Sequence, residues 1–176
     1  MFSKKHIAIG LFMIFATLLT STTKATSAPT PQKIPNGIIE ASNKFGLWRD
    51  IYNSKQKVVV YSYISGSTCP YQSQEFHNKI TSAAGASGGK YKARPTGPDK
   101  LEKEINAATA KLNAKAKNIT SPAQAKAMNK EIQAFNKLMS FTNKCTLKAC
   151  IIDPSKGEYI LLNRNSAEVV GAMKSY

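Results

Sequence analysis

The stretch that decides the fold is residues 57–80, which read KVVVYSYISGSTCPYQSQEFHNKI. β-Branched and aromatic residues occupy every position from 58 to 64 except Ser62 and predict a strand. Positions 65–67 hold small residues that suit a turn. Cys69 is followed directly by Pro70, which favours the first position of a helix, and apolar residues then recur at helical spacing. The sequence therefore predicts that a strand delivers Cys69 to a helix N-terminus, where free N–H groups and the helix dipole favour a thiolate.

This segment resembles the active-site segment of thioredoxin-like proteins, in which a strand, a short loop and a C-P-x-C motif open a helix. The motif here is Cys69-Pro70-Tyr71-Gln72, so Gln72 stands where the family has its second cysteine. The resemblance implies that Cys69 attacks a disulfide and that Gln72 cannot resolve the mixed disulfide. Three readings follow: an external thiol resolves Cys69, another cysteine of the chain pairs with it, or the fold serves only for binding.

The N-terminal segment is predicted to direct export. Residues 1–25 have a basic start and a short apolar run at 7–19, with Thr23 and Ala25 at the positions that signal peptidases prefer. The apolar run is short for a membrane span, so we expect cleavage, no transmembrane span in the mature chain, and a periplasmic or secreted protein. Residues 26–37 are rich in proline and predict an extended leader.

The charge balance is consistent with acidic partners, and solubility alone is the other interpretation. The chain of 176 residues carries 25 Lys and Arg against 10 Asp and Glu. Removing the three lysines of residues 1–25 leaves 22 basic against 10 acidic residues, a net charge near +12. Such a balance suits an acidic protein, a phosphate-rich membrane surface or nucleic acid. The lysines are spread along the chain and no nucleic-acid motif is present, which argues against specific nucleic-acid binding.

The segments on either side of residues 57–80 differ in character. Apolar residues at helical spacing predict a helix over residues 38–52, with Trp48 in the core and Gly46 as a weak point. Residues 84–98 are rich in Gly, Ser, Ala and Pro and predict a linker or mobile loop, with a short strand at 90–94 as an option.

Residues 99–141 are predicted to form a helical hairpin inserted into the domain. Asp99 and Glu102 suggest a capping box for the first helix, and Ser121 begins a second N-terminal signature with Pro122 at the first helical position. Apolar stripes follow in both segments. Dsb-type disulfide oxidoreductases, which the chain resembles, carry a helical insertion at the same place.

The last part of the chain predicts a β-hairpin followed by a helix. Residues 146–152 and 158–162 are the two strands, residues 153–157 carry turn chemistry, and Asn165 with Glu168 caps the closing helix. This ending is similar to the second half of the thioredoxin fold. Together these features predict a domain over residues 38–176 of class α/β, a thioredoxin-like central sheet flanked by helices, and a one-sided α+β sandwich is the alternative.

The three cysteines are an odd number in an exported chain, so one thiol stays free, is capped or pairs with another molecule. In the thioredoxin family a cis-proline faces the active-site sulfur at the start of the hairpin. Cys145 stands near that place here, so the resemblance implies a Cys69–Cys145 disulfide, with Cys150 as a buried thiol. The competing pair is Cys145–Cys150, which needs a bend between them because residues five apart on one strand point to opposite faces. A chain without a disulfide is the third possibility.

The sequence contains few other candidate catalytic residues. His77 lies eight residues after Cys69 and is expected to be an exposed polar histidine, with a Cys–His pair as the alternative. No metal site or cofactor is expected, because the only other histidine lies in the signal peptide. We therefore expect an exported thiol-disulfide oxidoreductase-like protein whose site is Cys69, without a second motif thiol and with Cys145 as its partner. Its substrates would be protein thiols or disulfides. A non-catalytic binding or assembly module of a secretion or conjugation system is the alternative.

Overall fold

The computed structural model describes residues 29–176, and the predicted signal peptide lies outside the described residues. Its sheet has five strands in the order β1-β5-β4-β2-β3. Their bounds are β1 Gln32–Lys33, β2 Lys57–Ser62, β3 Tyr91–Thr96, β4 Ala149–Asp153 and β5 Glu158–Leu162. β2 lies inside the sheet, parallel to β3 and antiparallel to β4, while β4 pairs with β5 and β5 with β1 in antiparallel fashion.

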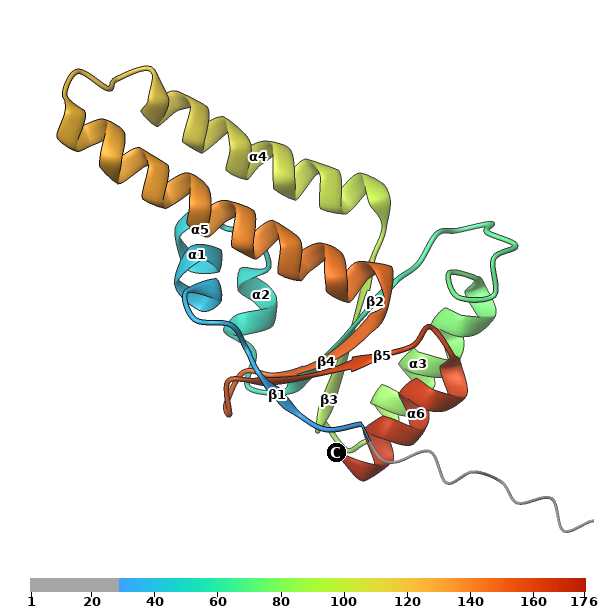
Figure 1. Ribbon diagram of the computed structural model, residues 1–176. Coiled ribbons are helices and arrows are strands. Elements are labelled where there is room, and N and C mark those ends of the chain that lie inside the picture. The colour runs from blue at the N-terminus through green and yellow to red at the C-terminus, as the bar shows by residue number, and fades with distance from the viewer. Residues whose placement is uncertain (1–28) are drawn as a thin grey trace, which may run out of the picture.

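Helices cover both faces of this sheet (Figure 1). Helices α1 (Ile38–Phe45), α2 (Arg49–Tyr52), α4 (Pro98–Ala116) and α5 (Pro122–Leu147) share one hydrophobic cluster with Val58 and Val60 of β2. Helices α3 (Gln74–Gly85) and α6 (Ser166–Ser175) share the other with Val59 and Tyr61. The predicted α/β class with flanking helices is confirmed, and a one-sided sandwich is excluded.

The continuous apolar sequence of β2 fits a strand whose two faces are both covered. All four residues from Val58 to Tyr61 are fully buried, because successive side chains point to opposite faces and both faces are covered. The strand ends at Ser62 rather than at Ile64. Its register places Val60 opposite Cys150 and Tyr61 opposite Ala149, so the carboxyl end of β2 lies beside the start of β4.

The helix predicted over residues 38–52 is divided in two. Gly46 ends α1 with φ +82° and donates its N–H to the Ser42 carbonyl, 2.8 Å away. The buried Ser42 hydroxyl donates to the Leu47 carbonyl at 2.6 Å, and Trp48 has φ +60° at the start of α2. The break satisfies the helix end while keeping Trp48 fully buried, as expected for a core residue.

Helices α4 and α5 form the predicted hairpin, which projects beyond the sheet (Figure 1). Ser121 and Gln124 make the capping box at the start of α5, with Pro122 at the first helical position. The capping box expected from Asp99 is wrong, because α4 begins at Pro98 and Gly97 is its N-cap. Helix α5 continues through Leu147, beyond the expected end of the insertion at residue 141. The described part of the chain contains no helix long and apolar enough to cross a membrane.

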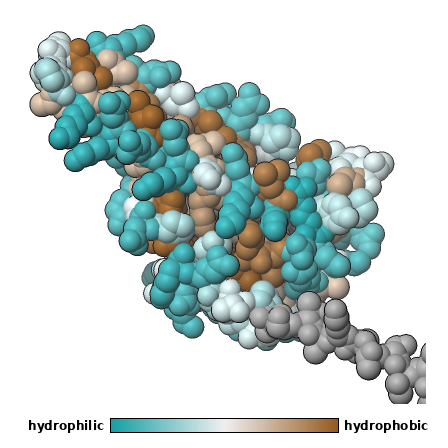
Figure 2. Space-filling view, in the orientation of Figure 1, coloured by the Kyte–Doolittle hydropathy of each residue, from teal (hydrophilic) through white to brown (hydrophobic). Residues whose placement is uncertain are grey.

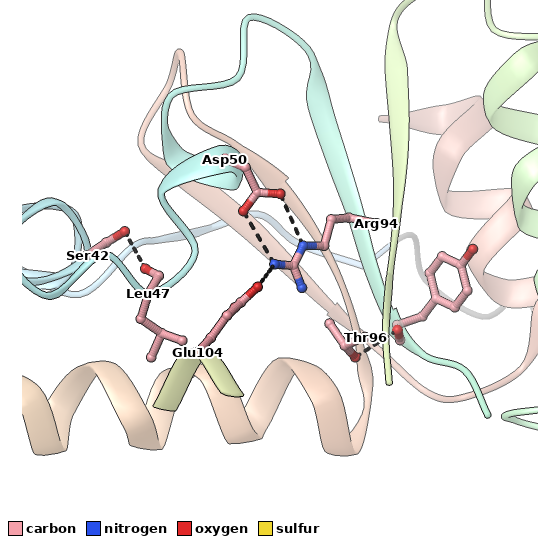
Figure 3. A network of polar contacts seen from close by, with 7 residues as sticks. Ser42, Leu47, Asp50, Arg94, Thr96 and Glu104 are labelled. Atoms are coloured by element: carbon pink, nitrogen blue, oxygen red, sulfur yellow. Dashed lines mark hydrogen bonds and ion pairs between the residues drawn. The ribbon is translucent and has the colours of Figure 1, made fainter. Parts of the chain in front are cut away.

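The segment expected to be a loop at residues 84–98 contains the edge strand β3. Arg94 of this strand is 3% exposed and points toward α2 and α4. Its Nε and Nη2 atoms donate to the two Asp50 carboxylate oxygens at 3.2 and 3.3 Å, and Nη2 donates to Glu104 at 2.8 Å (Figure 3). Thr96 donates to the Tyr61 carbonyl at 2.9 Å. These contacts fix β3 to β2 and to the helices over it.

Strand β1 and the turns before and after β5 complete the other edge of the sheet. The short strand β1, inside the segment expected to be an extended leader, pairs with Tyr159 and Glu158. The Asp153 carboxylate accepts hydrogen bonds from Ser155 Oγ and the Lys156 N–H in the turn that leads to β5. Asn165 caps α6 as predicted, and Glu168 accepts instead from the Asn163 N–H.

Candidate functional site

The Cys69 loop leaves the carboxyl end of β2 and enters α3. Helix α3 begins at Gln74, and its N-cap is Ser73, whose hydroxyl accepts from the Phe76 N–H at 3.3 Å. The prediction that Pro70 opens the helix is therefore wrong. Residues 69–72 form a turn in which the Gln72 N–H donates to the Cys69 carbonyl at 3.0 Å. This turn separates Cys69 from the first N–H groups of α3, the groups that were expected to favour its thiolate.

Gln72 holds the loop in place. Its side-chain Nε2 donates to Ser62 Oγ at 3.2 Å, and its carbonyl accepts from the Ile64 N–H at 3.0 Å. The Cys69 N–H donates to Ser67 Oγ at 3.1 Å. Gln72 thus holds the loop against the end of β2 through both its side chain and its backbone carbonyl.

Cys69 is the free cysteine among the described residues, and it is half-buried. Its motif neighbours Pro70 and Tyr71 are exposed, with Tyr71 at 48%. The loop therefore presents one partly accessible sulfur beside an exposed aromatic ring.

Cys145 and Cys150 form a disulfide with Cα atoms 5.1 Å apart, so the expected Cys69–Cys145 bridge is wrong and the alternative pairing is present. Helix α5 includes Cys145 and ends at Leu147. The chain then bends at Lys148, and Cys150 lies in β4, which begins at Ala149. This bend brings the two sulfurs to the same face of the sheet, among the residues that pack against α1 and α5. Both are fully buried, so Cys145 does not act as the partner of Cys69, and Cys150 is not the free thiol.

His77 was expected to be exposed, but it is half-buried in an aromatic cluster. Its Nδ1 lies 2.8 Å from the Tyr61 hydroxyl, and its ring stacks on Tyr63 with centroids 4.3 Å apart. Tyr63 donates to the Gln74 side chain. Burial, with a smaller effect of Tyr63, raises the pKa of the Tyr61 hydroxyl above its ordinary value. The phenol of Tyr61 is therefore neutral at physiological pH.

This cluster was not predicted from the sequence, although a signal for it was present. Tyr61 and Tyr63 have the same parity as Val59, so they point to the face of the sheet that α3 covers. His77 and Gln74 lie in the first turns of α3. An alternating pair of tyrosines at a strand end, followed by a histidine on the next helix, was sufficient to place these groups together.

The Cys69 loop offers one half-buried free thiol, and the separate His77 cluster offers a half-buried histidine with tyrosine partners. Residues 29–176 hold no group of three or more His, Cys, Asp or Glu side chains that could bind a metal ion. No family model, curated protein or solved structure matches the chain.

Proposed function

We propose that this protein is an exported, thioredoxin-like protein that uses Cys69 as a single exchange thiol. The fold assignment is supported by a strand–helix–strand unit, β2-α3-β3, followed by the β4-β5 hairpin and α6, with β2 between β3 and β4. The observation that carries the function is the state of the cysteines: a buried disulfide uses two of them, and the third is free and half-buried at the end of β2.

The chemistry is a thiol–disulfide exchange with a protein disulfide. The Cys69 thiolate attacks one sulfur, a bond forms to it, and the other sulfur leaves as a thiolate that takes up a proton. Since the Cys145–Cys150 pair is fully buried, a small external thiol must attack the mixed disulfide and release Cys69. The reaction needs no cofactor.

The first prediction concerns thiol count and turnover. Native protein should react with one equivalent of an alkylating reagent, all of it at Cys69, and Cys69→Ser should not react, because the other two cysteines are bonded to each other. With glutathione present, the protein should reduce a peptide–glutathione mixed disulfide faster than glutathione alone. Without an added thiol it should not reduce insulin, since no second thiol is accessible. Mass spectrometry and a coupled reductase assay measure both.

The control is Tyr71→Ala, which alters an exposed neighbour of Cys69 without removing the thiol. It should keep the single alkylation, and its thermal unfolding should match the natural chain within a small margin. Turnover with glutathione that persists in Cys69→Ser would contradict the proposed role of Cys69.

A binding or assembly module without catalysis is the second candidate. The observation that favours it is the start of α3 at Gln74, which leaves Cys69 away from the helix N-terminus, together with the structural use of Gln72. In this case the natural chain and Cys69→Ser would both give the rate of glutathione alone. Partner capture that is equal in the two proteins would then support binding through the fold.

Export is proposed from residues 1–25, and the Cys145–Cys150 disulfide supports it because such bonds persist outside the cytosol. The second prediction is that the mature chain begins at Thr26, since Ala25 stands at the position before the cut. Intact mass and N-terminal sequencing of protein recovered from the periplasm or medium measure this. Ala25→Phe should retain the uncleaved chain, whereas recovery of a chain that still begins at Met1 from the natural sequence would contradict the proposal.

A further inference from the structure

Helix α5 carries a straight row of exposed lysines. Lys126, Lys130, Lys137 and Lys144 are all exposed, and their spacings of four, seven and seven residues place them within an arc of about 40° on an α-helix. The row spans about 27 Å at a rise of roughly 1.5 Å per residue. We call these four residues the lysine ridge. The hairpin that carries it projects away from the sheet (Figure 1), and hydrophilic side chains are prominent along it (Figure 2).

Nearby carboxylates do not neutralise the ridge. Glu131 is the one acidic residue of α5, and it lies about 100° around the helix from Lys130. Its carboxylate is held by Lys44 at 2.7 Å and by Lys115 at 3.1 Å, on the other side of the helix. No ion pair within residues 29–176 involves a ridge lysine. Lys144 contacts the Tyr159 hydroxyl at 3.5 Å and keeps its charge exposed.

Helix stability does not account for the ridge. The apolar side of α5, which includes Met128, Phe135, Leu138 and Phe141, is buried against the hairpin and the core, and the exposed ridge runs along the edge of this buried side, about 20–60° around the helix from Phe141. The first turn of α5 has no acidic residue, although negative charge is the favoured choice near a helix N-terminus. A surface built for solubility would mix both signs of charge.

The composition of the ridge indicates a partner bound by charge alone. Gln133 and Ser140 lie in the gaps between the ridge lysines, and both are exposed and polar. The exposed apolar residue Leu147 lies beyond Lys144 at the end of α5, so the gaps between the lysines lack the apolar anchors of a protein interface. Lysine is a point charge without the bidentate geometry of arginine. A helix in a DNA groove has phosphates on both flanks, whereas these four exposed lysines lie in a single row within about 40° of arc, which suits one flat charged surface. We propose that the lysine ridge lies on a membrane surface rich in anionic phospholipid headgroups.

The test is co-sedimentation of the mature chain with vesicles of phosphatidylcholine alone or mixed with phosphatidylglycerol. We expect binding only to the mixed vesicles and its loss at high salt, because exposed charges are screened. The variant Lys126→Gln, Lys130→Gln, Lys137→Gln should partition roughly 100-fold more weakly, since each lysine near an anionic surface contributes about fivefold. Glutamine keeps helix propensity, and circular dichroism checks the fold.

The matched control removes the same charge elsewhere. Lys55→Gln, Lys117→Gln, Lys174→Gln changes three exposed lysines from three other parts of the chain and should weaken partitioning less than about fivefold in total if the ridge makes the contact. Equal losses in the two triple variants would overturn the proposal in favour of net charge. Failure to bind mixed vesicles would overturn it as well, and so would ridge-dependent binding to duplex DNA that is tighter than binding to vesicles at the same salt.

Discussion

Replacing Trp48 by alanine is expected to lower the free energy of unfolding by about 4 kcal/mol, as for other buried aromatic side chains. Trp48 is fully buried in the cluster that joins α1, α2 and the sheet. The Arg94 guanidinium lies 6.0 Å from its ring. Alanine loses these contacts and leaves a cavity between elements that pack on several sides. Urea unfolding followed by far-ultraviolet circular dichroism measures the loss.

The backbone conformation of Trp48 allows a second comparison, between glycine and alanine at this position. Trp48 has φ +60°, a left-handed conformation that costs a non-glycine residue roughly 1–2 kcal/mol. Glycine in a helix interior is normally less stable than alanine by roughly 0.5–1 kcal/mol. Here Trp48→Gly should instead be more stable than Trp48→Ala by about 1 kcal/mol. A Trp48→Gly protein that is the less stable of the two would contradict this account, and Tyr71→Ala serves as an exposed aromatic control.

Local signals that agree with long-range packing allowed most elements to be predicted. The continuous apolar run at residues 58–61 gave an internal strand because both faces of the sheet are covered. Ser121 with Gln124 gave a helix start that uses both hydrogen bonds of the capping box. The strand at residues 158–162 was predicted with its observed bounds. In each case one short segment contained the information.

The structure around Cys69 was harder to predict from the sequence, because two local preferences compete there. Pro70 favours the first helical position, but Ser73 is a better N-cap, and the turn that Gln72 closes satisfies the chain between them. Strand β3 was predicted only as an optional short strand at residues 90–94, for a different reason. Its flanking glycines, Gly88 and Gly89, look like a loop, and the strand is stabilised by pairing with β2, which no local pattern reveals.

The disulfide depended on where a helix ends. Phe141 and Cys145 continue the apolar stripe of α5 at a spacing of four, which was evidence that the helix extends beyond residue 141. With Cys145 in the helix and Cys150 in the strand, the bend at Lys148 makes the short pairing feasible. The free state of Cys69 follows from this pairing.

The other large effect is expected at Arg94. Arg94→Met should lower the free energy of unfolding by about 3 kcal/mol, because removing one member of a buried ion pair leaves its partners without compensation. The side chain of Arg94 is 4% exposed and that of Glu104 is 23% exposed, while Asp50 is 47% exposed and can be solvated in part. The matched control is Lys92→Met, which removes one exposed charge from the same strand and should change stability by less than about 0.5 kcal/mol.

The pH dependence of this effect has a definite sign. Burial opposes ionisation of Asp50, but its hydrogen bond and attraction to Arg94, aided by Lys100 and Lys92, hold the pKa of the carboxyl below the ordinary value of 3.8. A carboxyl with a lowered folded pKa contributes stability above its unfolded pKa and loses it as pH falls through the folded value. The difference between the natural chain and Arg94→Met should therefore be constant near neutral pH and shrink below about pH 4. Urea unfolding of both proteins across this range measures it, and a gap that stays constant on acidification would show that Arg94 stabilises β3 by packing against Trp48 rather than through Asp50.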